Sequence, residues 1–205
     1  MRNGTEMNKR GRPRQFDEDA VNEAMQDLFL RQGFAATSLD DIAKVTSLNR
    51  PSLYRAFGNK EDMYLGCLRH RTEELAAELG GVFVEAESFE AALWGFYAGL
   101  IEYYYEAGDD RGLGCLVFSN AIADAPSNDQ IRAYLGETLE RVRRAITRCV
   151  QKHHPDCPDA QLNAATELAL SVFLSLGTRT RSGQERASVE CATRASVKAI
   201  AGLVG

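Results

Sequence analysis

The feature that most constrains this chain is a pair of short helical patterns between Thr37 and Lys60. The first spans about residues 38–45 and the second about residues 50–57, and a polar break separates them. Asn49 is a good N-cap for the second, because its side-chain oxygen can accept hydrogen bonds from backbone N–H groups that lack a partner at a helix start. Helices this short must pack on another element to be stable. The spacing predicts a helix-turn-helix.

The same stretch resembles the DNA-binding domain of the TetR (tetracycline repressor)/AcrR family of bacterial regulators. The resemblance covers about residues 16–68 and is carried by a set of residues, namely Gly33, Phe34, Thr37, Ser38, Asp41, Ile42, Ala43, Leu48, Asn49, Ser52, Leu53, Tyr54, Phe57, Asn59, Lys60 and Glu61. It implies an all-α fold of about nine helices. Residues 1–60 would form an N-terminal arm and a three-helix helix-turn-helix DNA-binding domain. Residues 61–205 would form a helical ligand-binding and dimerisation domain.

Outward-facing residues of the second short helix are candidates for reading DNA. Arg50 and Arg55 are the best candidates for guanine edges, because a planar guanidinium can donate to O6 and N7 together. Pro51 could touch a thymine methyl group. The resemblance gives Tyr54 a phosphate contact and places Lys60 near the DNA backbone. The alternative is an ordinary solvated helix face.

Further DNA contacts are expected outside this helix. Arg12 and Arg14 lie in a polar, basic N-terminal stretch that suits an arm along the minor groove, and a disordered start is the alternative. Thr37 or Ser38 should cap the first short helix, and the resemblance adds a phosphate contact for their hydroxyls. The expected DNA-binding set is Arg12, Arg14, Thr37, Ser38, Arg50, Pro51, Ser52, Tyr54, Arg55 and Lys60.

Charge is distributed unevenly along the chain, whose net charge is −5. Residues 1–60 contain 10 Lys or Arg and 8 Asp or Glu, whereas the remainder contains 14 and 21. The surplus of positive charge therefore lies at the end that carries the helix-turn-helix, where phosphate contacts need it.

Longer helical patterns fill the middle of the chain, at about residues 59–79, 88–107, 113–124 and 128–152. The resemblance implies that this region encloses an inducer pocket, and such pockets combine apolar walls with a few polar groups. The candidate lining residues are Trp94, Tyr97, Tyr104, Phe118 and Asn120. Aromatic residues at helical spacing are also typical of a plain core, and that alternative remains open.

The last two helical patterns, at about residues 160–181 and 185–203, are rich in Ala, Ser and Gly. Small residues allow helices to approach closely, and both helices are apolar on more than one side. The resemblance implies a homodimer in which these two helices pair with the same two of a second subunit. The core of a monomeric bundle is the alternative.

Other classes of protein find little support in the sequence. No spacing of a nucleophile and a base and no phosphate-cradling glycine loop points to an enzyme, so no catalytic residue and no cofactor is expected. The adjacent His153 and His154 favour a solvated loop over a metal site. Five scattered cysteines favour a reduced cytoplasmic compartment. The chain shows neither a signal peptide nor an apolar run long enough to span a membrane.

The sequence thus predicts a DNA-binding transcriptional regulator, a repressor that a small-molecule inducer releases from its operator. Its expected partners are double-stranded operator DNA, a second copy of the chain and an effector of unknown structure. The alternative is a dimeric helical small-molecule-binding protein, or an enzyme, without a DNA function.

Overall fold

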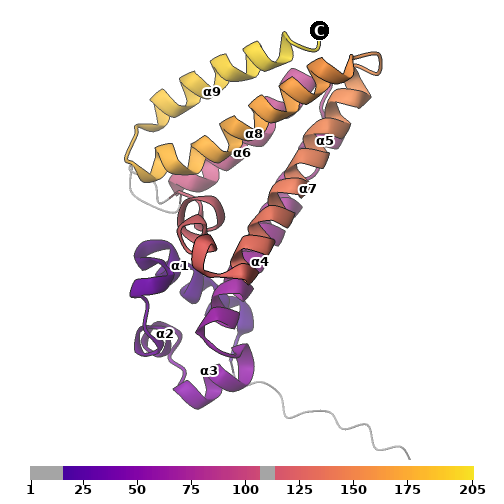
Figure 1. Ribbon diagram of the computed structural model, residues 1–205. Coiled ribbons are helices and arrows are strands. Elements are labelled where there is room, and N and C mark those ends of the chain that lie inside the picture. Colours follow the sequence, from indigo (N-terminus) through magenta and orange to yellow (C-terminus); the bar gives the residue numbers. More distant parts are fainter. Residues whose placement is uncertain (1–15, 107–113) are drawn as a thin grey trace, which may run out of the picture.

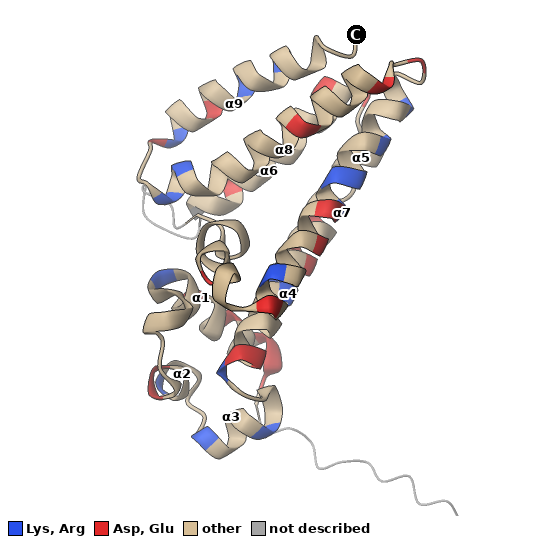
Figure 2. Ribbon diagram, in the orientation of Figure 1, with Lys and Arg blue, Asp and Glu red and all other residues tan. Residues whose placement is uncertain are grey.

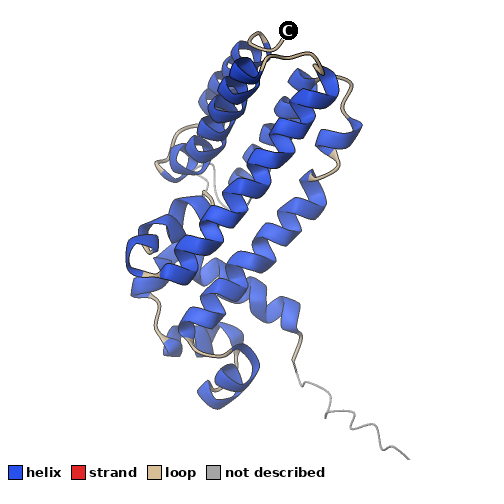
Figure 3. Cartoon of the chain, turned by 45° about the vertical axis from the view of Figure 1, so that its right-hand side comes forward, coloured by secondary structure: helices blue, strands red, loops and turns tan. Residues whose placement is uncertain are grey.

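The computed structural model describes residues 16–106 and 114–205, and within these ranges it contains nine α-helices and no strand (Figures 1 and 3). The all-α prediction is confirmed. The helices are α1 (Glu18–Ala36), α2 (Leu39–Thr46), α3 (Arg50–Phe57), α4 (Lys60–Leu79), α5 (Val82–Glu85), α6 (Phe89–Glu106), α7 (Asp129–His153), α8 (Asp159–Arg181) and α9 (Arg186–Ala201).

The first three helices and the start of α4 form a small head at one end of the molecule (Figure 1). Asp17 caps α1, and Gly33 bends it with a φ of 77°, a conformation that glycine adopts without strain. Each short helix of the head contributes one fully buried anchor, Ile42 from α2 and Leu53 from α3. These anchors join the core that α1 and α4 provide, which holds the two short helices in place.

Helix α4 belongs to both the head and the larger body. Its first half buries Met63, Tyr64 and Leu68 in the head, and its second half continues along the body toward α5 (Figure 1). One hydrophobic core runs from Val21 to Val204 through both parts. The boundary at residue 60 therefore stays a prediction, because a single helix contributes side chains to either side of it.

The structure departs from the predicted helices in two places. Helix α5 was not expected after the glycine pair at residues 80–81. The expected helix at residues 113–124 is instead a π-helical turn, η1 (Leu116–Asn120), and a 3₁₀ turn, η2 (Ala121–Ala123), and a second 3₁₀ turn follows at η3 (Ala125–Ser127). Gly114 precedes these turns with a φ of 74°, and its Cα lies so close to α8 that a Cβ would meet the Gly177 carbonyl. Tertiary packing thus replaces the regular helix with one wide π turn and two tighter 3₁₀ turns.

The body is a bundle in which α6 lies against α8 and α9, and α7 lies against α8 (Figures 1 and 3). Fully buried residues such as Leu93 and Ile101 of α6 and Val189 of α9 fill the space between these helices. No helix in residues 16–106 or 114–205 is both long and apolar enough to traverse a membrane.

Candidate nucleic-acid interface and body cavity

The start of α2 is fixed by a reciprocal cap. The Ser38 hydroxyl accepts from the backbone N–H of Asp41 at 3.1 Å, while the hydroxyl and backbone N–H of Ser38 donate to the Asp41 carboxylate at 2.6 and 2.9 Å. These donated bonds lower the pKa of Asp41 below its ordinary value. Ser38 is exposed, so its cap lies at the surface of the head.

Thr37 has a different role from the expected phosphate contact. Its side chain is only 1% exposed, and its hydroxyl donates to the Gly33 carbonyl at 2.7 Å. A hydroxyl buried in this way cannot reach a phosphate outside the protein. Of the two residues proposed to cap α2, Ser38 makes the cap, and Thr37 instead closes the bend at the end of α1.

Helix α3 presents a polar outer face on a buried anchor. Asn49 caps it by accepting from the Ser52 backbone N–H at 2.9 Å. Leu53 is fully buried, whereas Tyr54 is 49% exposed. The exposed side chains of α3 are Arg50, Pro51, Tyr54 and Arg55, and Ser52 is half-buried. Figure 2 shows the two arginines as the blue segments of α3 at the tip of the head.

Arg50 is held by a partner that the sequence did not reveal. Its Nε and Nη2 donate to the two carboxylate oxygens of Asp40 on α2, at 2.9 and 2.7 Å. Both side chains are largely exposed, at 54% for Arg50 and 74% for Asp40, so water can exchange for this ion pair readily. The pair uses the same two-pronged donor geometry that a guanine edge would need.

Lys60 lies at the first turn of α4, beside the head's aromatic residues. Its Nζ lies 4.3 Å from the centroid of the Phe34 ring, which keeps the ammonium next to the helix start. Asn59 and Asp62 form a second reciprocal cap there, with both bonds at 2.9 Å. Arg12 and Arg14 lie outside the described residues.

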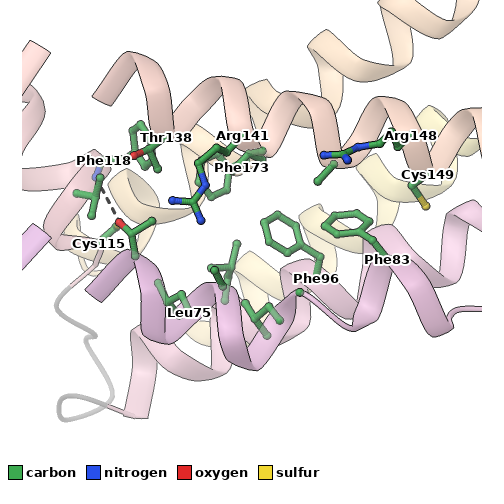
Figure 4. A pocket seen from close by; sticks show the side chains of 18 of the residues that line it. Leu75, Phe83, Phe96, Cys115, Phe118, Thr138, Arg141, Arg148, Cys149 and Phe173 are labelled. Carbon is green, nitrogen blue, oxygen red and sulfur yellow. Dashed lines mark hydrogen bonds between the residues drawn. The ribbon is translucent and has the colours of Figure 1, made fainter. Parts of the chain in front are cut away.

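The body contains a cavity of about 570 Å³ between α4, α5, α6 and α7, with one end at η1 (Figure 4). Its walls are mainly apolar, and four rings follow one another along it. The ring centroids of Phe83 and Phe96 are 5.0 Å apart, those of Phe96 and Phe173 5.9 Å, and those of Phe173 and Phe118 5.1 Å. The volume lies within the range of roughly 300–1,000 Å³ that is usual for small-molecule sites.

Comparison with known proteins identifies the head. The family model described as "Bacterial regulatory proteins, tetR family" matches residues 23–67, which hold most of α1, all of α2 and α3, and the start of α4. The chain is 32% identical over 123 residues to the HTH-type transcriptional repressor ComR of Escherichia coli (strain K12). It is 25% identical over 187 residues to the repressor BdcR of the same strain.

The head of this chain is a TetR-family domain.

The match to ComR covers 60% of this chain and 58% of that repressor, so it spans less than two thirds of ComR. The match to BdcR covers 90% and 89% of the two chains. Solved structures of TetR-family regulators share the fold. The regulator CifR, in a complex with operator DNA, superposes with a TM-score of 0.81 at 21% identity, over 92% of this chain and 99% of that one. The reduced form of NemR from E. coli gives 0.71 at 15% identity, over 88% and 94%.

Two of the five residues expected to line a ligand pocket in the body do line the cavity, Tyr104 and Phe118. Trp94 lies elsewhere, with the guanidinium of Arg194 3.6 Å from its ring centroid. Tyr97 is fully buried, and its hydroxyl donates to the Ala169 carbonyl at 2.6 Å. These two aromatic residues fasten α6 to α9 and α8, which corresponds to the alternative of a plain core.

Asn120 is the third residue that does not line the cavity, and it points the other way, toward the head. Its side-chain amide donates to the carbonyls of Phe29 and Leu30 on α1, at 3.1 and 2.9 Å. Cys115 and Phe118, a few residues before it, line the cavity. The short η1 turn therefore touches the cavity on one side and the last regular turn of α1 on the other.

Sequence reasoning missed the cavity's polar residues, most of which come from α7. Thr138, Arg141, Arg148 and Lys152 line it together with the apolar Val142 and Cys149. They lie at spacings of three, four and seven residues, so they follow one helix face. Because polar and apolar residues are mixed along this amphipathic helix, the sequence pattern did not distinguish the residues that face the cavity from those that face solvent.

The outward faces of α8 and α9 carry rows of small side chains. On α8 the exposed row contains Ala160, Ala164, Leu168 and Ser171, and on α9 it contains Cys191, Ala195 and Ala199. Leu168 is 49% exposed and is the one large apolar side chain among these small neighbours.

Proposed function

We propose that this TetR-family chain is a dimeric DNA-binding transcriptional regulator, a repressor that a small molecule releases from its operator. The observation that carries the proposal is the outer face of α3, where Arg50, Tyr54 and Arg55 are exposed on a helix anchored by a fully buried Leu53. A short, rigid helix with exposed arginines suits the major groove. CifR, which shares this fold, has been solved on operator DNA.

The dimer would form through α8 and α9, whose exposed small side chains permit close packing of helices. Two heads held by such a four-helix interface can enter successive major grooves, which are about 34 Å apart on one side of the duplex. A near-palindromic operator follows from the two-fold symmetry of the dimer.

Release would follow from the position of the cavity beside α4, the helix that belongs to both the head and the body. A ligand between α4 and α7 touches the second half of α4, whose first half belongs to the head. The same ligand touches η1, whose Asn120 is bonded to α1. If the ligand favours a different angle between head and body, the two heads no longer fit both grooves, and DNA affinity falls.

The experiment begins with selection of a binding site from random DNA duplexes by the full-length chain. Binding of the selected duplex is then measured by fluorescence anisotropy for the wild type and for the double variant Arg50→Ala with Tyr54→Ala. We expect the double variant to lose at least about a hundredfold in affinity, because it removes a base-reading group and a phosphate contact.

Arg132→Ala is the matched control, since Arg132 is an exposed arginine on α7, in the body. It should bind the selected duplex as the wild type does. Affinity should also fall steeply with added salt, as expected when cations neutralise phosphates. Unchanged binding by the double variant would remove α3 from the interface. Failure to select any duplex would favour a ligand-binding protein without a DNA function.

A further inference from the structure

The charges that line the body cavity all have the same sign. The charged residues among its lining are Arg141, Arg148 and Lys152 of α7, and the lining includes neither an aspartate nor a glutamate. The remaining lining is apolar apart from a few hydroxyl and thiol groups. An apolar space with an uncompensated positive edge attracts molecules that combine an apolar body with a negative group.

Two of the three cations already have protein partners. Lys152 donates from its Nζ to the Val84 carbonyl at 2.7 Å, and Arg148 donates from its Nε to the Arg144 carbonyl at 3.1 Å. Within the described residues, the Arg141 guanidinium has neither a hydrogen bond nor an ion pair. Figure 4 shows it extending from α7 into the space between α7 and α4.

Thr138 lies one helical turn before Arg141 and faces the same space (Figure 4). Its side chain is only 5% exposed, and its hydroxyl has no hydrogen-bond partner among the described residues. The hydroxyl is open to the cavity, one helical turn from Arg141, so it can donate to an acceptor that lies there. One planar cation and one hydroxyl match one carboxylate, which accepts two bonds from the guanidinium and a third from the threonine.

The apolar walls lead away from this polar pair in a fixed direction. Phe118 and Cys115 lie at the same end as Thr138, whereas Phe83 and Cys149 lie at the other end (Figure 4). Phe96 and Phe173 occupy the stretch between them. A ligand whose carboxylate meets Arg141 could therefore lay its apolar part against the Phe96 and Phe83 rings.

We propose that the cavity binds an amphiphilic monocarboxylate, a molecule with one carboxylate group and an extended apolar body, with Arg141 and Thr138 binding the carboxylate. The inference rests on the proposed function only in taking this ligand to be the effector. The carboxylate would lie beside η1, the turn whose Asn120 bonds to α1. A neutral molecule of the same shape would leave Arg141 unpaired, and a cationic one would be repelled by it.

The test measures binding to the full-length chain without DNA, by isothermal titration calorimetry at neutral pH and below the self-association concentration of each probe. The probes are alkyl carboxylates from octanoate to tetradecanoate, with decanol and decylammonium as neutral and cationic matches. We expect decanoate to bind at least about tenfold more tightly than decanol or decylammonium, because neither of these two molecules can form the hydrogen-bonded ion pair with Arg141.

Arg141→Gln should weaken carboxylate binding by at least about tenfold and leave decanol binding unchanged. Thr138→Val, which keeps the shape of the side chain, should produce a smaller loss of about threefold. Arg144→Gln is the matched control, because Arg144 is an exposed arginine on the same helix and does not line the cavity. Its carboxylate affinity should equal that of the wild type, and thermal unfolding checks that each variant folds.

Equal affinities for carboxylate, alcohol and ammonium would overturn the inference, as would carboxylate binding that Arg141→Gln leaves unchanged, or the absence of binding by every carboxylate in the series. The DNA assay is separate from this one. Carboxylate binding that depends on Arg141 but leaves DNA affinity unchanged would uphold the ligand class and contradict release by this ligand.

Discussion

At the scale of single residues, the ion pair between Arg50 and Asp40 is the contact that most affects how this chain would meet DNA. The carboxylate of Asp40 occupies the Nε and Nη2 donors of Arg50, which form one of the two-pronged edges with which a guanidinium can read a guanine. The pair is exposed, so DNA can compete for the arginine. Asp40 itself stays behind as a negative charge near the phosphates, which opposes binding to every sequence.

Asp40→Asn should therefore raise DNA affinity by about threefold at low salt, because it removes a repulsive charge and frees Arg50. The gain should be greater on unrelated duplexes than on the selected site, so discrimination between sequences falls. Anisotropy titrations on both duplexes measure these effects. Asp129→Asn is the control, since Asp129 pairs with Arg132 in an equally exposed ion pair on α7. If both variants behave alike, Asp40 has no effect of its own at the interface.

At the scale of secondary-structure elements, η1 is the connection between the cavity and the head, and its path depends on glycine. Gly177 on α8 lies so close to η1 that a Cβ would stand 2.4 Å from the Ser119 Oγ and 3.0 Å from the Cys115 Cβ. The Ser119 hydroxyl accepts from the Cys115 backbone N–H at 3.1 Å, so it cannot move aside without losing that bond. A larger residue at position 177 would have to push η1 away from α8.

Gly177→Ala should lower the free energy of unfolding by about 1–3 kcal/mol, because the overlap with η1 outweighs the gain in helix propensity. Gly136→Ala is the matched control in the middle of α7, where a Cβ would meet nothing within 4 Å. That substitution should stabilise the chain by up to about 1 kcal/mol. Urea unfolding followed by circular dichroism measures both. Equal stability of the two variants would mean that η1 is not held by close contact with α8.

At the scale of the whole molecule, the cavity separates the two places where this chain would meet other macromolecules. The head lies at one end of the molecule, and α8 and α9 lie in the body (Figure 1). Most of the residues that line the cavity belong to α4, α5, α6 and α7, so the exposed faces of α8 and α9 are separate from it. In the proposed mechanism, a ligand between α4 and α7 would change the angle of the head without entering either surface. In a dimer, a small change in each subunit would add to the change in the other, because the two heads must fit one DNA duplex.

Leu168→Glu should convert a dimer to a monomer, because a charge in the middle of a close-packed helical interface cannot be solvated. Sedimentation velocity measures the mass, and the monomer should lose affinity for a two-site duplex by at least about tenfold. Ile122→Glu is the control, since Ile122 is 51% exposed on η2, away from α8 and α9. A dimer that survives Leu168→Glu would place the interface elsewhere.

The sequence by itself determined the helical class, the helix-turn-helix and most helix positions. These features depend on local causes such as the Asn49 cap, the glycine at position 33 and the helical spacing of apolar residues, all of which can be read from neighbouring residues. It also placed Arg50, Tyr54 and Arg55 on the outer face of α3, because one buried leucine fixes the orientation of so short a helix.

Only the tertiary structure decided what lies between the helices. The partner of Arg50 is ten residues away on another helix, and Asn120 bonds to α1 across 90 residues of sequence. Tyr97 and Trp94 have the same aromatic character as Phe96, yet only Phe96 lines the cavity. Which side of a largely apolar helix faces a cavity depends on how its neighbours pack around it, and that information comes from contacts between residues far apart in the chain.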